Sequence, residues 1–292
     1  MDKKKVDNYL NSELTAEEEI EKAKGNKHNI MSRKKSSQNE IKLLVKGLCD
    51  ENGLARRNYA KAIAEFGSAA LPELIKALLN SKNVIQRRAA AKTLKLVNDP
   101  SALPHLIKAL TNDSDSVVQF SAAGAIAIFG EAAVNHLIIV LENQEYTEMQ
   151  YGLAAWCLEF IGAKAPNAIK KAAKSKNNNV KSAAISALEE HIRQSQDQEA
   201  IQLVESAIND TAENIQIEAI KLVGKLYRIE SLIPTLILKL KNKNPDIRKA
   251  SILSLIQLNI NEAINPLKDL LEVEQDKYVI AIIKLALRKI NK

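Results

Sequence analysis

The stretch Leu71-Pro-Glu-Leu-Ile-Lys-Ala-Leu-Leu-Asn80 returns further along the chain as Leu103-Pro-His-Leu-Ile-Lys-Ala-Leu-Thr-Asn112. Both copies have proline at the second position and apolar residues at helical spacing, which predicts a helix that begins near the proline. One helix repeated at a fixed interval of about 20–50 residues is typical of a repeat array. The stretch therefore predicts an all-α protein with the architecture of an α-solenoid, an α-α superhelix of helix pairs.

Three sets of residues, each called a register below, recur about every 31–32 residues and support the prediction. Small residues, expected where consecutive helices approach closely, recur as Ala60, Ala91, Ala123, Ala155 and later as Ala219, Ala250 and Ala281. Residues that tolerate the left-handed backbone conformation, expected to end each first helix, recur as Gly67, Asn98, Gly130 and Gly162. Prolines expected to open the second helices are Pro72, Pro104, Pro166 and Pro234.

The registers divide the chain into helix-pair units. The units are 50–80, 81–112, 113–143, 144–175, 176–209, 210–242 and 243–274, with a half unit over 275–292. Unit 176–209 departs from the pattern, with Ile185 near the alanine register and Arg193 near the glycine register. We therefore predict a first sub-array over 38–175 and a second over 176–292. An N-terminal short helix and basic linker over 1–37 precede them.

The formal net charge of +7 arises largely in the N-terminal region. Residues 22–35 contain six Lys or Arg side chains and no acid. Aromatic residues are not interleaved with these cations and charge in the repeats is nearly balanced, so we expect a solvated linker and no nucleic-acid partner. Before this linker, Thr15 and Glu18 form a potential capping box. A helix from about Gln38 to Leu48 is expected to cap the array.

The two cysteines, Cys49 and Cys157, lack the spacing of a disulfide motif or a metal site. Cys157 lies in an apolar helical pattern and is expected to be a small buried residue. We expect no metal site, since two histidines on separate helices lack a third ligand in register. The chain shows no signal peptide and no membrane-spanning segment, so we expect a cytoplasmic protein without a membrane partner.

One segment, Tyr151-Gly-Leu-Ala-Ala-Trp-Cys-Leu-Glu-Phe-Ile-Gly-Ala-Lys-Ala-Pro166, carries a specific family resemblance. It resembles the Gly-Leu-Ala-x-Trp-x-Leu-x-x-Ile-Gly segment of the E/F-type phycobilin lyases. These proteins are built of short HEAT-like repeats and include phycoerythrin lyases and lyase-isomerases. The opening Leu14-Thr-Ala-Glu-Glu is similar to the start of the same proteins.

The resemblance implies a bilin lyase, an enzyme of the carbon–sulfur lyase class. Such an enzyme attaches a linear tetrapyrrole, phycoerythrobilin or phycocyanobilin, to a cysteine of a phycobiliprotein subunit through a thioether. It implies no prosthetic group, location in a cyanobacterial cytoplasm or plastid stroma, and in some relatives a second lyase subunit or self-association. The bilin, the acceptor cysteine and any accompanying isomerisation stay open. The alternative is a non-catalytic HEAT-repeat adaptor in phycobilisome assembly or degradation.

A bilin carries two propionates, pyrrole N–H groups and flat conjugated rings. Candidate propionate ligands are two arginine pairs at matching positions of consecutive units, Arg56, Arg57, Arg87 and Arg88. The alternative is that these arginines bind the turn of the neighbouring repeat. Candidate ring contacts are Tyr59, Phe120, Tyr151 and Trp156. For Trp156 the alternative is core packing, because its helix is otherwise apolar.

Proton transfer needs groups that titrate or donate near the bilin. His105 and His136, one repeat interval apart, belong to a polar ladder with Glu73 and Asn167 at the starts of second helices. Either histidine could exchange a proton with the bilin or the incoming thiol, and the alternative is a solvent-exposed helix start. We assign His136, Asp115 and Tyr151 as catalytic candidates and His105 as a bilin ligand. Asp115 could instead serve only as a helix N-cap.

Overall fold

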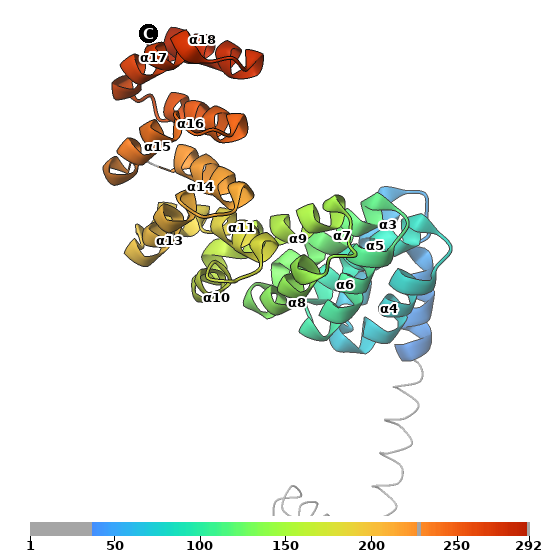
Figure 1. Ribbon diagram of the computed structural model, residues 1–292. Coiled ribbons are helices and arrows are strands. Elements are labelled where there is room, and N and C mark those ends of the chain that lie inside the picture. Colours follow the sequence, from blue (N-terminus) through green and yellow to red (C-terminus); the bar gives the residue numbers. More distant parts are fainter. Residues whose placement is uncertain (1–36, 227–228, 291–292) are drawn as a thin grey trace, which may run out of the picture. The chain divides into compact units, whose positions relative to one another are not determined.

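The computed structural model describes residues 37–226 and 229–290, and every regular element in these ranges is a helix (Figure 1). The predicted all-α class is confirmed. The expected helix at Thr15–Glu18 and the basic segment 22–35 lie outside the described residues. The described helices include none that is long and apolar enough to span a bilayer.

The chain divides into two compact units, Met1–Asp99 and Pro100–Lys292. The described part of the first unit contains a helix over 37–47, followed by α3 (Gly53–Ala64), α4 (Leu71–Asn80) and α5 (Val84–Val97). Ile41, Val45 and Leu48 of the first segment are buried. The boundary predicted after residue 175 falls inside the second unit and stays a prediction.

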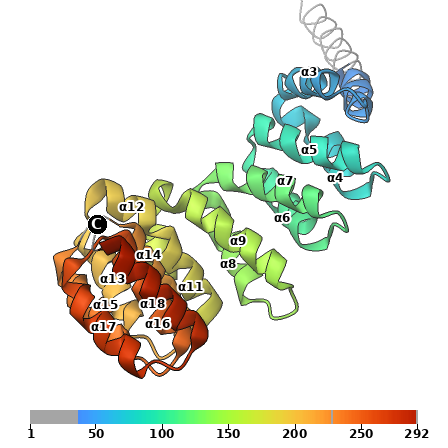
Figure 2. The same ribbon diagram turned by 90° about the horizontal axis from the view of Figure 1, so that it is seen from above.

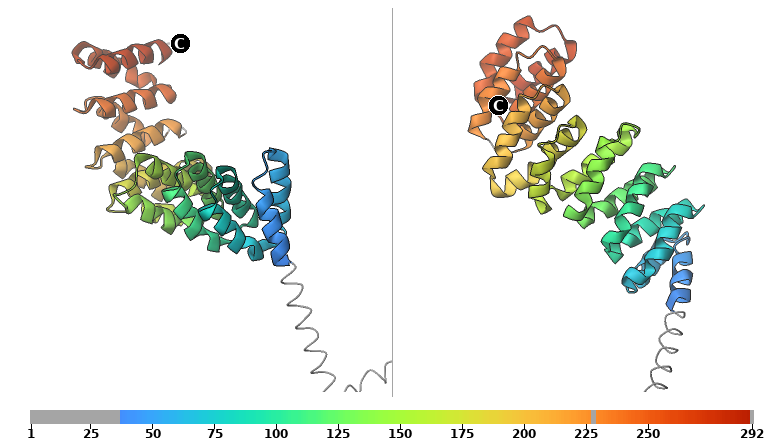
Figure 3. Two further views of the ribbon diagram at one scale, coloured as in Figure 1. Left: turned by 90° about the vertical axis from the view of Figure 1, so that its right-hand side faces the viewer. Right: turned by 60° about the horizontal axis from the view of Figure 1, so that its bottom comes forward.

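The second unit consists of two helical layers (Figure 2, Figure 3). Consecutive first helices pack against one another. They are α7 (Ser116–Ile126), α9 (Glu148–Ile161), α11 (Asn178–Ala187), α14 (Glu213–Lys225), α16 (Pro245–Gln257) and α18 (Lys277–Ile290). Each has a second helix packed against it. The second helices are α6 (Leu103–Asn112), α8 (Glu131–Glu142), α10 (Pro166–Ala172), α13 (Gln198–Ile208), α15 (Ile233–Lys239) and α17 (Ile264–Val273).

An additional helix explains why unit 176–209 departs from the registers. The first helix α11 ends at Ala187, and α12 (Glu189–Ser195) follows before the second helix α13 begins. The C-cap residue after α12, Gln196, adopts the left-handed conformation with φ of 53°. Arg193 therefore lies within α12 rather than at the end of a first helix, and the glycine register is interrupted there.

The glycine register has two different physical causes. Gly67, Asn98 and Gly130 have φ of 54°, 54° and 57°, which confirms the expected positive φ at these three positions. Gly162 has φ of −25°, so the prediction is wrong there. A Cβ atom on Gly162 would lie 2.1 Å from the carbonyl oxygen of Ala187. Glycine is required at 162 because the backbone of the next repeat approaches it closely.

The proline and alanine registers hold with two exceptions. Each of the four prolines lies in the first turn of a second helix, as predicted. The alanines in the register are buried except for Ala155 and Ala281. Ala155 is half-buried because it lines a pocket of the second unit. Ala281 is exposed on α18, against which no later described helix packs.

Cys157 is fully buried, as predicted, and its Sγ lies 3.3 Å from the carbonyl oxygen of Ala123. Burial raises the pKa of its thiol to about 12 from an ordinary value of 9.0. The thiolate is the nucleophile in disulfide exchange, so the reactive fraction is about a thousandfold smaller than for a free thiol.

In the native protein at pH 8, we expect a disulfide reagent to label the half-buried Cys49 and to leave Cys157 unmodified. Cys157 should react only after unfolding in denaturant, when burial no longer opposes its ionisation. Counting labelled thiols by mass spectrometry measures this. Native Cys49→Ser protein should take up no label, and rapid labelling of that variant would contradict the burial of Cys157.

Candidate functional site

A pocket of about 630 Å³ lies along the first helices α9, α11 and α14 of the second unit. This volume falls within the range of about 300–1,000 Å³ that small-molecule sites occupy. The wall from α9 includes Gly152, Ala155, Trp156 and Glu159, together with Glu148 and Tyr151. The wall from α11 consists of Asn179, Ser182, Ala183 and Ser186. The first four residues named on α9 and the four on α11 have the spacing i, i+3, i+4, i+7, so each set is one face of its helix.

The hollow exists because the facing side chains are small. Gly152 and Ala155 on α9 meet Ser182, Ala183 and Ser186 on α11, and none of these side chains is long enough to fill the space. A Cβ atom on Gly152 would have no neighbouring atom within 4 Å. The pocket is thus a consequence of sequence on two adjacent helices.

Aromatic side chains form one side of the pocket. Trp156 lines it and is 45% exposed, so the alternative of core packing for this residue is wrong. The rings of Trp156 and Phe160 are tilted by 31° with centroids 5.9 Å apart, and Lys164 Nζ lies 4.7 Å from the Phe160 centroid. Tyr151 also lines the pocket, and its hydroxyl donates to the carbonyl of Asn143. The pocket therefore includes the exposed indole of Trp156, which lies next to the ring of Phe160.

Two carboxylates of the pocket have contrasting surroundings. Glu218 on α14 accepts a hydrogen bond from Ser186 Oγ at 3.2 Å and pairs with Lys221 at 2.8 Å. Glu159 on α9 is partly desolvated by the surrounding helices, which raises the pKa of its carboxyl. Lys225 opposes this rise, whereas the nearby charges of Glu218 and Glu189 add to it. Glu159 is exposed to solvent, so the same pocket contains one carboxylate fixed by partners and one that is accessible from solvent.

The arginine pairs lie in the first unit, outside this pocket. Arg56 Nη1 donates to the carbonyls of Asp50 at 2.5 Å and Glu51 at 2.9 Å. Arg87 Nη1 likewise donates to the carbonyl of Ser81 at 3.0 Å. Each of these guanidinium nitrogens therefore binds, and braces, the turn of its own helix-pair repeat. The alternative given above was a bond to the turn of the neighbouring repeat, and these bonds are of a different kind.

This brace recurs along the chain with a constant offset of six residues. The remaining examples are Gln119 to Asp113 O at 2.7 Å, Gln216 to Asp210 O at 2.5 Å and Arg248 to Asn242 O at 2.8 Å. A long polar side chain in the first turn of a first helix thus satisfies a carbonyl that the preceding turn would otherwise leave without a protein donor. In the first unit, Arg57 is exposed and Arg88 is half-buried.

The other first-unit candidate, Tyr59, packs on the helix over 37–47. A Cβ atom on Gly47 would come 2.7 Å from the Tyr59 ring, so glycine makes room for the ring there. Phe120 on α7 is 57% exposed, and it does not line the pocket of α9, α11 and α14. Of the predicted ring contacts, the structure brings together Tyr151 and Trp156.

The predicted catalytic residues are not gathered in one place. Asp115 is the N-cap of α7, with Oδ1 accepting from the backbone N–H of Val118 at 2.9 Å. His136 lies on the second helix α8, where Nδ1 is 3.3 Å from the carbonyl oxygen of Ala132. His105, on the second helix α6, is half-buried. Of the three catalytic candidates, only Tyr151 lines the pocket.

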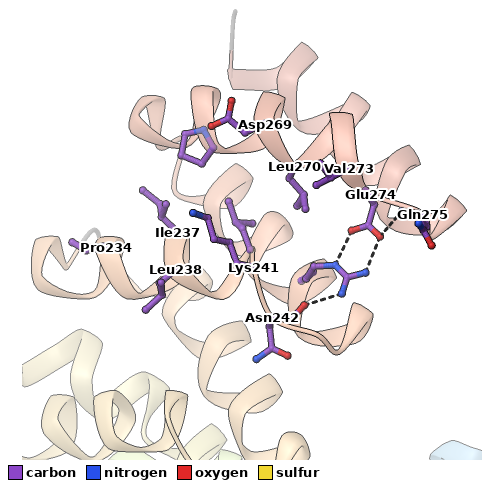
Figure 4. Close-up of a pocket in the computed structure, with 13 residues that line it drawn as sticks. Pro234, Ile237, Leu238, Lys241, Asn242, Asp269, Leu270, Val273, Glu274 and Gln275 are labelled. Carbon is purple, nitrogen blue, oxygen red and sulfur yellow. Dashed lines mark hydrogen bonds and ion pairs between the residues drawn. The ribbon is translucent and has the colours of Figure 1, made fainter.

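A second pocket, of about 740 Å³, lies between α15 and α17 (Figure 4). Its walls include the exposed Leu238 and Val273. Its guanidinium, Arg248, is already bound to both carboxylate oxygens of Glu274 at 2.7 Å. Arg248 is therefore occupied, which leaves Lys241 as the other cation in the lining, and none of the predicted site residues lines this pocket. The pocket of α9, α11 and α14 is therefore the candidate functional site.

Comparison with known proteins places this fold in a family. The sequence matches the HEAT-repeat family over residues 41–127 and 202–288. Bilin biosynthesis protein MpeU from Synechococcus sp. (strain WH8020) is 36% identical over 281 residues, which cover 96% of this chain and 95% of MpeU. The chain belongs to the MpeU family of HEAT-repeat proteins. The family predicted from the segment 151–166 is thus confirmed.

Solved structures of low sequence identity share the fold. The complex of Kap95 and Nup1 has 14% identity and a TM-score of 0.51, covering 86% of this chain and 41% of that chain. The CpcE and CpcF complex of phycocyanin lyase from Nostoc sp. PCC7120 has 17% identity and a TM-score of 0.34, covering 86% and 94%. The first of these likenesses supports the solenoid architecture of the MpeU family member described here.

Sequence reasoning missed Glu159 and Glu218, which line the pocket together with a third acid, Glu148. A signal for Glu159 was available, because Gly152, Ala155, Trp156 and Glu159 share one helical face inside the segment that carries the family resemblance. No comparable signal existed for Glu218. It lies about two units later in the sequence, and only the stacking of α11 and α14 brings it to the pocket.

Proposed function

We propose that this chain is a bilin lyase, which binds a linear tetrapyrrole in the pocket of α9, α11 and α14. It then promotes attachment of the bilin to a phycobiliprotein cysteine through a thioether. The observation that carries the proposal is the exposed Trp156 beside a pocket of about 630 Å³, in a chain 36% identical to a bilin biosynthesis protein. Phycoerythrobilin and phycocyanobilin are the proposed substrates.

The pocket offers the groups that a bilin requires. The indole of Trp156 provides a flat apolar face on which a pyrrole ring can stack. Glu218, held by Ser186 and Lys221, can accept hydrogen bonds from pyrrole N–H groups. Lys164, at the edge of the aromatic pair, provides a cation for a propionate. The roles that stay predictions are the ligand roles of Arg56, Arg57, Tyr59, Arg87, Arg88, His105 and Phe120 and the catalytic roles of His136 and Asp115.

The attacking thiol belongs to the acceptor, so the chain contributes positioning and proton handling. The acceptor is proposed to be a phycobiliprotein subunit that presents its cysteine at the mouth of the pocket. A second lyase subunit or a second copy of this chain is a further proposed partner.

We expect Gly152→Phe to weaken bilin binding by at least about tenfold, or 1.4 kcal/mol, because the new ring occupies the pocket. The site tolerates the substitution, since nothing lies within 4 Å of the added Cβ. Gly124→Phe is the matched control. Gly124 is also a helical glycine with nothing within 4 Å of an added Cβ, but it lies on α7 and does not line the pocket. Bilin affinity is measured by absorbance titration of the purified variants.

Attachment is tested by co-expressing the chain with a phycobiliprotein subunit and enzymes of bilin synthesis, then detecting a covalent, zinc-fluorescent adduct. Adduct formation that Gly152→Phe abolishes and Gly124→Phe preserves supports a lyase with this site. Equal loss in both variants would show that the pocket is wrongly assigned. Tight subunit binding without any adduct would instead favour the non-catalytic adaptor of phycobilisome assembly or degradation.

A further inference from the structure

Among the described residues, the pocket carboxylates of Glu159 and Glu148 have no fixed partner, and only Glu159 shares a helical face with Trp156 one turn away. On α14, Glu218 pairs with Lys221 at 2.8 Å. On α12, Glu189 pairs with Arg193 at 2.6 Å and with Lys225 of α14 at 3.0 Å. No hydrogen bond or ion pair ties the Glu159 carboxylate to another residue within 37–226 and 229–290. Its oxygens are therefore available to a bound molecule.

The position of Glu159 places its carboxyl beside the expected bilin ring. Glu159 follows Trp156 by three residues on the same face of α9, and both side chains line the pocket. The small residues Ala155, Ala183 and Ser186 line the same pocket. The carboxyl of Glu159 and the indole of Trp156 therefore both line the space in which the bilin is proposed to bind.

The charges that face Glu159 favour its protonated form relative to an ordinary glutamate. Partial burial raises the pKa of its carboxyl, and the charges of Glu218 and Glu189 act in the same direction. Lys225 acts against them, but its ammonium also binds Glu189. Glu218 is fixed by Ser186 and Lys221, which suits binding, whereas the exposed carboxyl of Glu159 is accessible to an incoming thiol.

We infer that Glu159 is the proton carrier of the attachment reaction, an inference that rests on the proposed function. Its carboxylate removes the proton from the acceptor thiol as the sulfur forms a bond with an exocyclic carbon of the bilin. The electron pair of that carbon's double bond moves into the conjugated ring system. Glu159 then returns the proton to a carbon of the tetrapyrrole. The thiol has been added across a double bond, with no leaving group, oxidant or reductant.

The test is a single-turnover transfer from pre-bound bilin to the purified acceptor subunit across a range of pH. We expect Glu159→Gln to bind bilin within about threefold of wild type and to transfer it at least about 100-fold more slowly near neutral pH. In wild type the rate should fall on acidification, at a higher pH than for an ordinary glutamate, because the ionised carboxylate is the base. In Glu159→Gln that acid limb should disappear. Its rate should then follow thiolate formation in the acceptor, near pH 8.5.

Two further variants complete the test. Glu159→Asp retains a carboxylate and should keep part of the neutral-pH rate, and Glu205→Gln, exposed on α13, is the charge-matched control. Wild-type transfer rates and an unchanged pH profile in Glu159→Gln would overturn the inference and leave the proposed function intact. A rate loss explained entirely by weaker bilin binding would also overturn the inference and leave the proposed function intact. Failure of wild type itself to bind or transfer bilin would reject the proposed function, and the role of Glu159 with it.

Discussion

Replacing Gly162 by alanine is expected to lower the free energy of unfolding by at least about 3 kcal/mol. An added Cβ would lie 2.1 Å from the carbonyl oxygen of Ala187 and 3.2 Å from its carbonyl carbon. The obstructing atoms belong to the backbone, so no side-chain rotation can relieve the contact. The first helix α11 would have to move away from the end of α9. Chemical denaturation followed by circular dichroism measures the loss.

The matched control for this prediction is Gly124→Ala on α7. Gly124 is helical and a Cβ there meets nothing within 4 Å. Alanine should therefore stabilise the protein by about 0.5–1 kcal/mol through helix propensity. Opposite signs for these two substitutions are the expected result. A Gly162→Ala protein as stable as wild type would show that the close approach of α11 does not exist in solution.

Replacing Glu274 by glutamine is expected to cost about 3 kcal/mol or more at pH 7, because it breaks a buried ion pair. The Glu274 side chain is 4% exposed and binds Arg248 Nε and Nη2, each at 2.7 Å. Its Oε1 also accepts from the backbone N–H groups of Gln275 and Asp276, just before α18. The glutamine would leave a buried guanidinium without a counter-charge and weaken the turn that positions the last helix.

The stability lost on replacing Glu274 by glutamine depends on pH, and the pKa of Glu274 determines the direction of that dependence. The hydrogen bonds from Arg248 lower the pKa of Glu274 in the folded protein. Its stabilising contribution is therefore present above the pKa of an unfolded glutamate, about 4.3, and is lost as the pH falls through the lower folded value. The stability difference between wild type and Glu274→Gln should shrink below about pH 4. Asp246→Asn, which removes an i,i+3 pair with Lys249 whose carboxylate is 64% exposed, should change stability by less than about 1 kcal/mol.

The solenoid could be predicted from sequence because its determinants recur at a fixed interval. The substitution of Asn98 for glycine, with φ of 54°, shows that backbone conformation dictates that register. Gly162 occupies the same register for another reason, its contact with Ala187. Periodicity could not reveal this, because the same residue type satisfies both requirements. The sequence did not predict helix α12, because this helix occurs in one repeat only and therefore produces no periodic pattern.

The candidate site was only partly predictable. Tyr151 and Trp156 stood out as aromatic residues in a specific segment, and the structure places both at one pocket. The pocket itself arises where small side chains of α9 and α11 face each other. The sequence does not show which small residues face each other, because that depends on how the helices stack. The histidines could be placed on second helices, but the sequence did not reveal that the pocket would form among first helices.

The six-residue brace has a consequence for how such a chain can change over evolutionary time. In four of the five braces described, the side chain and the carbonyl that it binds belong to the same helix-pair unit, as for Arg87 with Ser81 and Gln216 with Asp210, and Arg248 also binds Lys243 of its own unit. A whole unit can therefore be duplicated or lost without separating the two partners. Array length can drift by recombination at little cost to the surviving turns. The close contact between Gly162 and Ala187 is different, because the two residues belong to neighbouring repeats. Loss of either repeat would remove one of the two partners.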